Sequence, residues 1–124
     1  MELGESKEDY LEAVYVLKHK GETNLKSIMV AEYLNVSKPS VTNAMHGLEK
    51  LGYLYKNSEQ ELYLTEKGRV LGKKLYERHH FFKDLLISIG VEEKTAEVEA
   101  CHMEHILSDN SFKLFKDFVF RETL

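Results

Sequence analysis

The sequence predicts a mainly α-helical protein, in which three helices and a two-stranded β-hairpin are followed by a second, helical domain. Apolar residues recur at helical spacing along most of the 124 residues. Two short runs rich in aromatic and apolar residues, 53–56 and 61–64, interrupt that spacing and are typical of paired strands. The elements are separated by a single proline, Pro39, and by glycines at positions 21, 52, 68 and 90.

The first helix is expected over residues 7–20. Ser6 can cap its N-terminus, and Asp9 then falls in the first turn, where a carboxylate suits the positive end of the helix dipole. Gly21 ends the helix. Its apolar positions follow the i, i+3/i+4 spacing and are Tyr10, Leu11, Val14, Tyr15 and Leu17.

Two shorter helices follow, separated by a tight turn at 35–37. The first covers 25–34. The second begins after Ser37, a favourable N-cap, carries Pro39 in its first turn and runs to about Leu51. The residues expected to face inward are Ile28, Ala31, Leu34, Val41, Met45 and Leu48.

The remaining elements are a hairpin and three more helices. The hairpin is expected between residues 53 and 65, with NSEQ between its two runs. Thr65 then caps a long helix that reaches about Ile89, and a further helix covers about 92–108. The apolar positions of a final helix are Phe112, Phe115, Phe118 and Val119.

This order of elements predicts a winged helix-turn-helix DNA-binding domain over 1–70, followed by helices over 71–124. The alternative is a small helical core with no ligand. The second helix of the helix-turn-helix unit is expected to enter a DNA groove with its N-terminus first, and short polar groups there can reach base edges or phosphates. The predicted DNA-contacting residues are Ser37, Lys38, Pro39, Ser40, Thr42, Asn43 and Lys56. Ser37 could serve only as an N-cap, and Ser40 and Thr42 could lie on a solvated face.

Charge and composition exclude several classes of protein. The net charge of −4 alone argues against DNA binding, because duplex DNA is a polyanion. From Lys38 to Ser58, however, three lysines stand against one glutamate, a local charge of +2. One cysteine excludes a disulfide scaffold and a four-cysteine zinc module. No apolar run approaches the roughly 20 residues of a membrane-spanning helix, so a cytoplasmic protein with no membrane partner is expected.

The C-terminal half contains a cluster of residues that can bind metal. On a helix, Cys101, Glu104 and His105 have i, i+3, i+4 spacing and share one face, with Glu97 one turn earlier. A thiolate, a carboxylate and an imidazole together suit a divalent transition metal. Further ligands can come from elsewhere in the chain, at Asp9, Glu12 and His79. The alternative is a set of exposed polar residues beside a buried cysteine.

Three segments together resemble the diphtheria-toxin-repressor-like (DtxR/MntR) family of iron- or manganese-dependent transcriptional repressors. They are EDYLEAVYVL, VAEYLNVSKPSVTNAMHGLEKLGYL and EACHMEHILSDNS. The resemblance spans roughly residues 5–120. It implies a winged helix joined to a helical dimerisation and metal-binding domain over 71–124, with metal between them. It also implies a homodimer rather than an enzyme, and a symmetric dimer predicts a palindromic DNA operator.

The resemblance also assigns ligands. Residues that fall on ligand positions of the manganese-responsive branch are Asp9, Glu12, His79, Glu104 and His105. Cys101 instead matches the iron-responsive branch, so the site resembles a hybrid of the two. Glu97 and Lys83 correspond to a His and a Glu of the iron branch's ancillary site, and a protonated lysine is not an ordinary ligand. The SH3-like third domain of the iron branch does not occur before Leu124, as in the shorter manganese branch or a truncated chain.

The donor set also predicts the metal and its role. Thiolate favours Fe(II) as the signal, with Mn(II) second, while Co(II), Ni(II) or Zn(II) could bind in vitro. Metal binding is expected to shift the protein towards a DNA-competent state, giving a repressor that controls iron or manganese homeostasis. One alternative is a metal-independent winged-helix regulator that senses oxidation or a small ligand through Cys101. A metalloenzyme using Cys101 and His105 is another.

Overall fold

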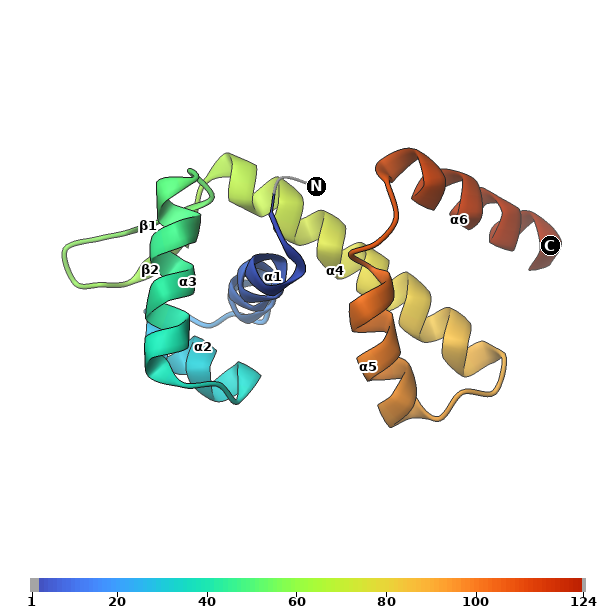
Figure 1. Cartoon of the computed structure of the whole chain (residues 1–124), viewed down its shortest axis with the longest axis horizontal. Helices are drawn as coiled ribbons and strands as arrows, with labels where there is room; N and C mark the ends of the chain where they lie inside the picture. The colour runs from blue at the N-terminus through green and yellow to red at the C-terminus, as the bar shows by residue number, and fades with distance from the viewer. Residues whose placement is uncertain (1–2, 124) are drawn as a thin grey trace. The chain divides into compact units, whose positions relative to one another are not determined.

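A computed structural model describes residues 3–123, with side chains described as far as Arg121. The chain divides into two compact units, the first ending at Arg78 and the second beginning at His79. The first unit holds α1 (Glu5–His19), α2 (Ser27–Leu34), α3 (Lys38–Lys50), β1 (Leu54–Lys56) and β2 (Leu62–Leu64) (Figure 1). Helix α4 (Glu66–Ser88) begins in the first unit and ends in the second, which continues with α5 (Glu93–Met103) and α6 (Asp109–Thr123).

Helix α1 begins earlier than the sequence predicted. Gly4 occupies the N-cap position and no side chain caps the helix, so the prediction that Ser6 is the cap is wrong. The first turn is acidic because it contains Glu5 and Glu8, which suits the helix dipole, and Asp9 lies one residue beyond it. Gly21, with a φ of +95°, follows the helix as expected.

Helices α2 and α3 form the predicted helix-turn-helix. Asn35 adopts the left-handed conformation that ends α2, and the Ser37 hydroxyl caps α3 by accepting a hydrogen bond from the Ser40 amide at 3.3 Å. Val41, Met45 and Leu48 face inward as predicted. Ile28 does not, because it lies in the first turn of α2 with its side chain substantially exposed.

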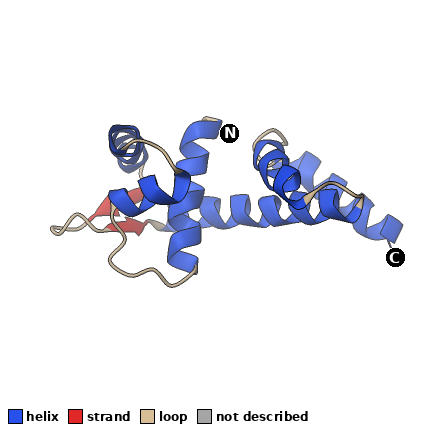
Figure 2. Ribbon diagram, turned by 90° about the horizontal axis from the view of Figure 1, so that it is seen from below, coloured by secondary structure: helices blue, strands red, loops and turns tan. Residues whose placement is uncertain are grey.

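The hairpin and its connection to α4 also match the expectation. Strands β1 and β2, red in Figure 2, pair antiparallel, and the register places Tyr55 opposite Tyr63. Between them the Asn57 side-chain oxygen accepts hydrogen bonds from the Glu59 and Glu61 amides, which closes the loop. Thr65 then caps α4, because its hydroxyl accepts from the Gly68 amide at 3.1 Å.

The core of the first unit is apolar and continuous across all of its elements. Buried side chains of α1, α2 and α3 meet those of the hairpin and the first half of α4. Fully buried members are Leu11, Val14, Leu25, Val30, Val41, Met45, Leu48, Leu62 and Leu75. Burial of apolar surface stabilises a fold by roughly 25 cal/mol per Å². The buried apolar face of α3 therefore fixes the orientation of this helix, and its opposite face is exposed.

The second unit has an aromatic core. Phe82 is fully buried and its ring contacts those of Phe112 and Phe115 with centroid separations of 5.7 and 5.9 Å. Ala96 and Ala100 are the buried positions of α5. This helix ends at Met103, so the predicted helix to residue 108 is too long, and Glu104 and His105 lie in the turn that follows.

Within residues 3–123 the structure contains six helices and one two-stranded hairpin, which confirms the mainly α-helical fold class. None of the helices in that range is both long enough and apolar enough to span a membrane.

Candidate metal centre and nucleic-acid interface

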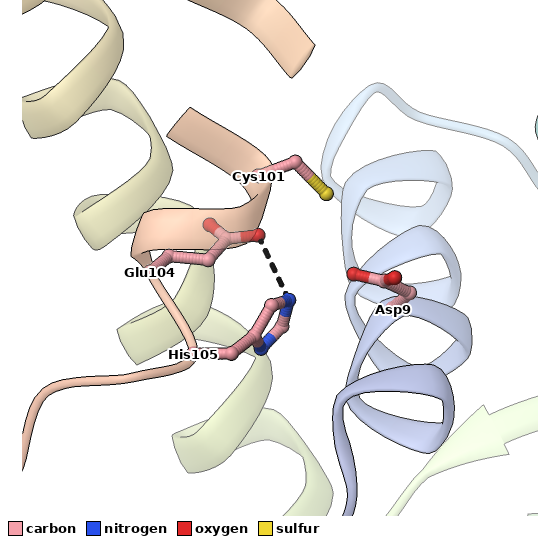
Figure 3. Close-up of side chains that lie close together, drawn as sticks. All are labelled: Asp9, Cys101, Glu104 and His105. Carbon is pink, nitrogen blue, oxygen red and sulfur yellow. Dashed lines mark ion pairs between the residues drawn. The ribbon is translucent and has the colours of Figure 1, made fainter. Parts of the chain in front are cut away.

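The end of α5 brings together a thiol, a carboxylate and an imidazole. Glu104 is the C-cap residue and keeps right-handed helical backbone angles, so the chain continues to turn beyond the helix. As a result, Cys101, Glu104 and His105 each offer a ligand atom within 4.8 Å of one another (Figure 3). The grouping predicted from i, i+3, i+4 spacing is therefore present, although only Cys101 lies within the helix itself.

Glu104 is the centre of this cluster. Its side chain is fully buried, and a buried carboxylate is costly unless positive charge or hydrogen-bond donors surround it. One oxygen, Oε1, lies 3.4 Å from His105 Nε2, the contact drawn as a dashed line in Figure 3. The other, Oε2, lies 3.5 Å from His79 Nδ1 on α4. The carboxylate is thus flanked by two imidazoles.

The environment of His79 favours its positively charged form. The close contact with the Glu104 carboxylate is the largest cause that raises the pKa of His79, and burial of the ring opposes it. The negative charges of Glu104 and Glu97 add to the increase. The imidazole is therefore held where a positive charge, from a proton or a cation, is favoured.

Glu97 contacts the other nitrogen of the same ring. Its Oε1 lies 2.9 Å from His79 Nε2, and its Oε2 lies 2.9 Å from the Lys83 ammonium. Partial burial would raise the pKa of Glu97, but the hydrogen bond from Lys83 and the positive charge of His79 outweigh it and lower the pKa. Glu97 is therefore an ionised carboxylate with both oxygens engaged.

The remaining predicted ligands lie on α1 in the first unit. Asp9 and Glu12 are three residues apart, so they share a face of that helix, and Glu12 is buried. Carboxylates, imidazoles and a thiolate are the donors that divalent first-row metals prefer, so the chemistry of the predicted residues fits such an ion. Their role as ligands stays a prediction.

The first unit contains a groove of about 680 Å³ between the helix-turn-helix and the hairpin. Its lining residues come from the start of α2, from α3 and from the hairpin. They are Lys26, Ser27, Ile28, Lys38, Thr42, His46, Glu49, Lys56, Asn57 and Gln60. Three lysines against one glutamate give this groove a formal charge of 3 − 1 = +2. A positively charged, concave surface beside an exposed helix suits a nucleic acid backbone.

Three of the predicted DNA-contacting residues, Lys38, Thr42 and Lys56, line this groove. The other four, Ser37, Pro39, Ser40 and Asn43, are exposed on the N-terminal part of α3 or directly before it. The hydroxyl oxygens of Ser37 and Ser40 are 2.8 Å apart and hydrogen-bonded to each other, so both side chains take part in the helix cap. DNA contact by these residues also stays a prediction.

Sequence reasoning missed Lys26, Ile28 and Gln60 as part of the groove. Ile28 was assigned to the core because it matches helical apolar spacing, but the helix begins only at Ser27. A basic residue directly before the first helix of a helix-turn-helix was the available signal for Lys26. Nothing in the local sequence distinguishes Gln60, which reaches the groove through the hairpin turn.

Comparison with known proteins finds relatives over nearly the whole chain. An uncharacterised HTH-type transcriptional regulator of Methanocaldococcus jannaschii is 36% identical over 118 residues, covering 94% of each chain. The HTH-type transcriptional regulator MntR of Lysinibacillus sphaericus is 39% identical over 115 residues, covering 92% of this chain and 81% of its own. The solved structure of the manganese regulator SloR superimposes with a TM-score of 0.81 at 28% identity, over 91% of this chain. The present chain spans about half, 53%, of SloR.

Two domain models match the chain in order. Residues 2–62 match the N-terminal DNA-binding domain of iron-dependent repressors, and residues 65–121 match their metal-binding and dimerisation domain. The first match contains α3 and the basic groove, and the second contains Cys101, Glu104 and His105. With both domains present and relatives at this level of identity, the chain belongs to the iron-dependent repressor family, the metal-dependent transcriptional regulators of the DtxR/MntR type.

Proposed function

We propose that this chain is a homodimeric repressor whose operator binding requires a divalent cation held by the cluster around Glu104. The family consists of metal-dependent transcriptional repressors with DNA-binding and dimerisation domains, and not of enzymes. The observation that carries the proposal is the buried carboxylate of Glu104 flanked by His79 and His105. Such a carboxylate is stabilised by positive charge, and a divalent cation supplies more of it than a protonated imidazole does.

The proposed ligands come from both units of the chain. They are Asp9 and Glu12 on α1, His79 on α4, and Cys101, Glu104 and His105 at the end of α5. When bound, the cation would supply positive charge that offsets the repulsion between the carboxylates of Asp9, Glu12 and Glu104. The proposed domain limits are 1–70 for DNA binding and 71–124 for dimerisation and metal binding.

The donor set bears on which metal is the signal. The family includes regulators named for iron and for manganese, so membership alone does not decide between them. The thiol of Cys101 favours Fe(II) over Mn(II), because Mn(II) prefers oxygen and imidazole donors. We therefore propose Fe(II) as the physiological signal, with Mn(II) second.

DNA binding is assigned to the exposed face of α3 and the basic groove. Lys38 and Lys56 would contact phosphates, while Thr42 and Asn43 carry short polar side chains that can pair with base edges. The second unit carries exposed apolar side chains, among them Val98, Ile106, Leu114 and Phe118, which suit pairing with a second copy. A two-fold dimer carries two recognition helices, so the proposed operator is palindromic.

The coupling between metal and DNA rests on α1. This helix carries Asp9 and Glu12 and also packs against α3 within the first unit. Lys7 on α1 lies directly against Gly47 of α3. A cation that binds better when both sets of ligands are assembled shifts the population towards one arrangement of α1, and so of the recognition helix.

The test is DNA binding with and without metal. Operator duplexes are selected from a random pool with the Mn(II)-loaded protein, and their affinity is then measured by fluorescence anisotropy in chelator, Mn(II) or anaerobic Fe(II). We expect metal to tighten binding about 5- to 150-fold, and Glu104→Gln to abolish the increase. Glu99→Gln removes an exposed carboxylate of α5 and should retain it. Equal affinity with chelator and with metal would contradict the proposal.

The same assay tests the role of Cys101, which is partly buried. Under the proposal, Cys101→Ser weakens the response to Fe(II) more than the response to Mn(II), because it removes the thiolate donor. A Cys101→Ser protein with an unchanged metal response but a lost response to peroxide would instead support a redox regulator.

A further inference from the structure

The two ring nitrogens of His79 face different carboxylates. Nδ1 lies 3.5 Å from Glu104 Oε2, and Nε2 lies 2.9 Å from Glu97 Oε1. The Nε2 contact has hydrogen-bond length, whereas the Nδ1 contact is too long for a strong hydrogen bond. The two sides of the ring are therefore not equivalent, and Glu97 is the residue that holds it.

Glu97 is itself held by Lys83. The Lys83 ammonium lies 2.9 Å from Glu97 Oε2, which leaves Oε1 for His79. Both Lys83 and His79 are on α4, four residues apart, while Glu97 is on α5. One carboxylate thus connects two successive turns of α4 to α5, and each of its oxygens already has a partner.

This arrangement selects a tautomer. An ionised carboxylate can only accept hydrogen bonds, so Nε2 of His79 must be the donor to Glu97. A neutral imidazole carries a single N–H, and placing it on Nε2 leaves the lone pair on Nδ1. Nδ1 is the nitrogen that faces Glu104, the centre of the proposed metal site.

We infer that Glu97 is a positioning residue and not a metal ligand, and that the Lys83–Glu97 pair fixes His79 as the Nε2–H tautomer with Nδ1 reserved for the cation. The part that concerns the cation rests on the proposed function. The tautomer belongs to the metal-free protein. A ligating histidine whose second nitrogen donates to a carboxylate is more basic and better oriented, and loss of such a carboxylate weakens metal binding about 10- to 100-fold.

The tautomer can be measured without metal. Imidazole ¹⁵N NMR of the metal-free full chain, at a pH where the ring is neutral, reports which nitrogen carries hydrogen, and His79→Gln identifies the signal. We expect Nε2–H in the wild type and a mixture in Glu97→Gln, because a glutamine amide both donates and accepts. Glu99→Gln, a matched loss of one carboxylate from α5, should keep the wild-type pattern. Identical His79 patterns in wild type and Glu97→Gln would overturn the inference.

Metal titration then separates positioning from ligation. Glu97→Gln should weaken Mn(II) binding about 10- to 100-fold with the number of bound ions unchanged, and Zn(II) should bind His79 through Nδ1. Loss of a bound ion in Glu97→Gln, or Zn(II) on Nε2, would show Glu97 to be a ligand or the assignment to be wrong. A wild-type protein that binds neither ion would overturn the proposed metal site, while the metal-free spectra would still decide whether Glu97 fixes the tautomer.

Discussion

At the scale of single residues, His79 is the group at which a proton and the proposed divalent cation would compete. Its pKa lies above the usual 6.5, first because of the close contact with the Glu104 carboxylate and then because of the charges of Glu104 and Glu97. A coordinating imidazole nitrogen must be deprotonated, so each metal ion that binds has to displace that proton. Under the proposed function, the affinity for metal would therefore depend on how far the pH lies above the raised pKa of His79.

We predict that Mn(II) affinity falls as the pH is lowered from about 8 to 6, approaching a tenfold loss per pH unit below the pKa of His79. The measurement is a Mn(II) titration at several pH values and constant ionic strength. His80→Gln, a change to the neighbouring imidazole outside the proposed ligand set, should keep the same slope. A pH-independent affinity across this range would show that His79 is not a ligand.

The contribution of His79 to the stability of the metal-free protein should have the opposite pH dependence. Because the folded protein raises the pKa of His79, the protonated ring contributes stability below the unfolded pKa of about 6.5. That contribution is lost as the pH rises through the folded pKa. The lowered pKa of Glu97 acts only in acid, since its contribution is complete above the unfolded value of about 4.5.

Spacing in the sequence was sufficient to group Cys101, Glu104 and His105, because one turn of helical backbone sets their separation. It was not sufficient for Glu97, which shares that helix but contacts His79 and Lys83 on α4. A contact between two helices depends on how they pack, and no local spacing encodes it. The resemblance to a family only indicated that Lys83 was an unsuitable ligand.

At the scale of elements, the helix-turn-helix and hairpin were predictable because each has local signals. These signals are the Ser37 cap, the left-handed conformation of Asn35 and the Thr65 cap. Each depends only on residues nearby in the sequence. Helix ends without such signals were misjudged. Helix α5 ends at Met103 although its sequence remains compatible with a helix, and α1 begins at Glu5, after Gly4 and without a capping side chain. Tertiary packing decides such ends, and propensity alone does not.

Two helical glycines allow a matched test of the connection between the hairpin and α4. A Cβ at Gly68 would lie 1.9 Å from the carbonyl oxygen of Tyr53, a backbone atom that cannot move away. A Cβ at Gly47 would lie 2.8 Å from Cε of Lys7, the flexible end of a side chain. Both positions would gain about 1 kcal/mol of helix propensity on substitution by alanine.

We predict that Gly68→Ala lowers the free energy of unfolding by about 1–3 kcal/mol, because the clash with Tyr53 outweighs the gain in propensity. Gly47→Ala should leave that free energy unchanged or raise it by up to about 1 kcal/mol, because Lys7 can change rotamer. Urea denaturation of the metal-free proteins measures both. Equal effects of the two substitutions would show that the close approach of α4 to Tyr53 does not constrain the fold.

The lysines of the basic groove allow a prediction about the affinity for DNA and its dependence on salt. Lys38 and Lys56 line it, whereas Lys50, at the far end of α3, does not. Lys38→Ala and Lys56→Ala should each weaken binding to specific and unrelated duplexes alike and reduce the slope of log K against log salt by about 1. Lys50→Ala removes the same charge and should leave the slope unchanged. A salt dependence that is the same for all three variants would place the DNA elsewhere.

At the scale of the whole molecule, the net charge of −4 can be related to the positions of three acidic residues. Asp9 and Glu12 belong to the first unit, and Glu104 belongs to the second. Under the proposed function these carboxylates face a cation, so the metal-free protein carries negative charge that opposes its approach to DNA, and the loaded protein carries less. Metal would therefore act on DNA binding through net charge as well as through the arrangement of α1.

The proposed coupling between metal binding and operator binding must act in both directions. If metal raises the affinity for operator DNA by some factor, the operator must raise the affinity for metal by the same factor, because both describe one coupling free energy. We predict that Mn(II) binds about 5- to 150-fold more tightly to the complex with operator than to the free protein, matching the anisotropy result. A duplex with one half-site scrambled is the control and should give a smaller increase, since a two-fold dimer engages both halves. Isothermal titration of Mn(II) into the protein with each duplex measures the factor. Equal Mn(II) affinity with and without operator, measured at a concentration where the free protein is already dimeric, would show that metal acts on DNA binding only by changing the concentration of dimer.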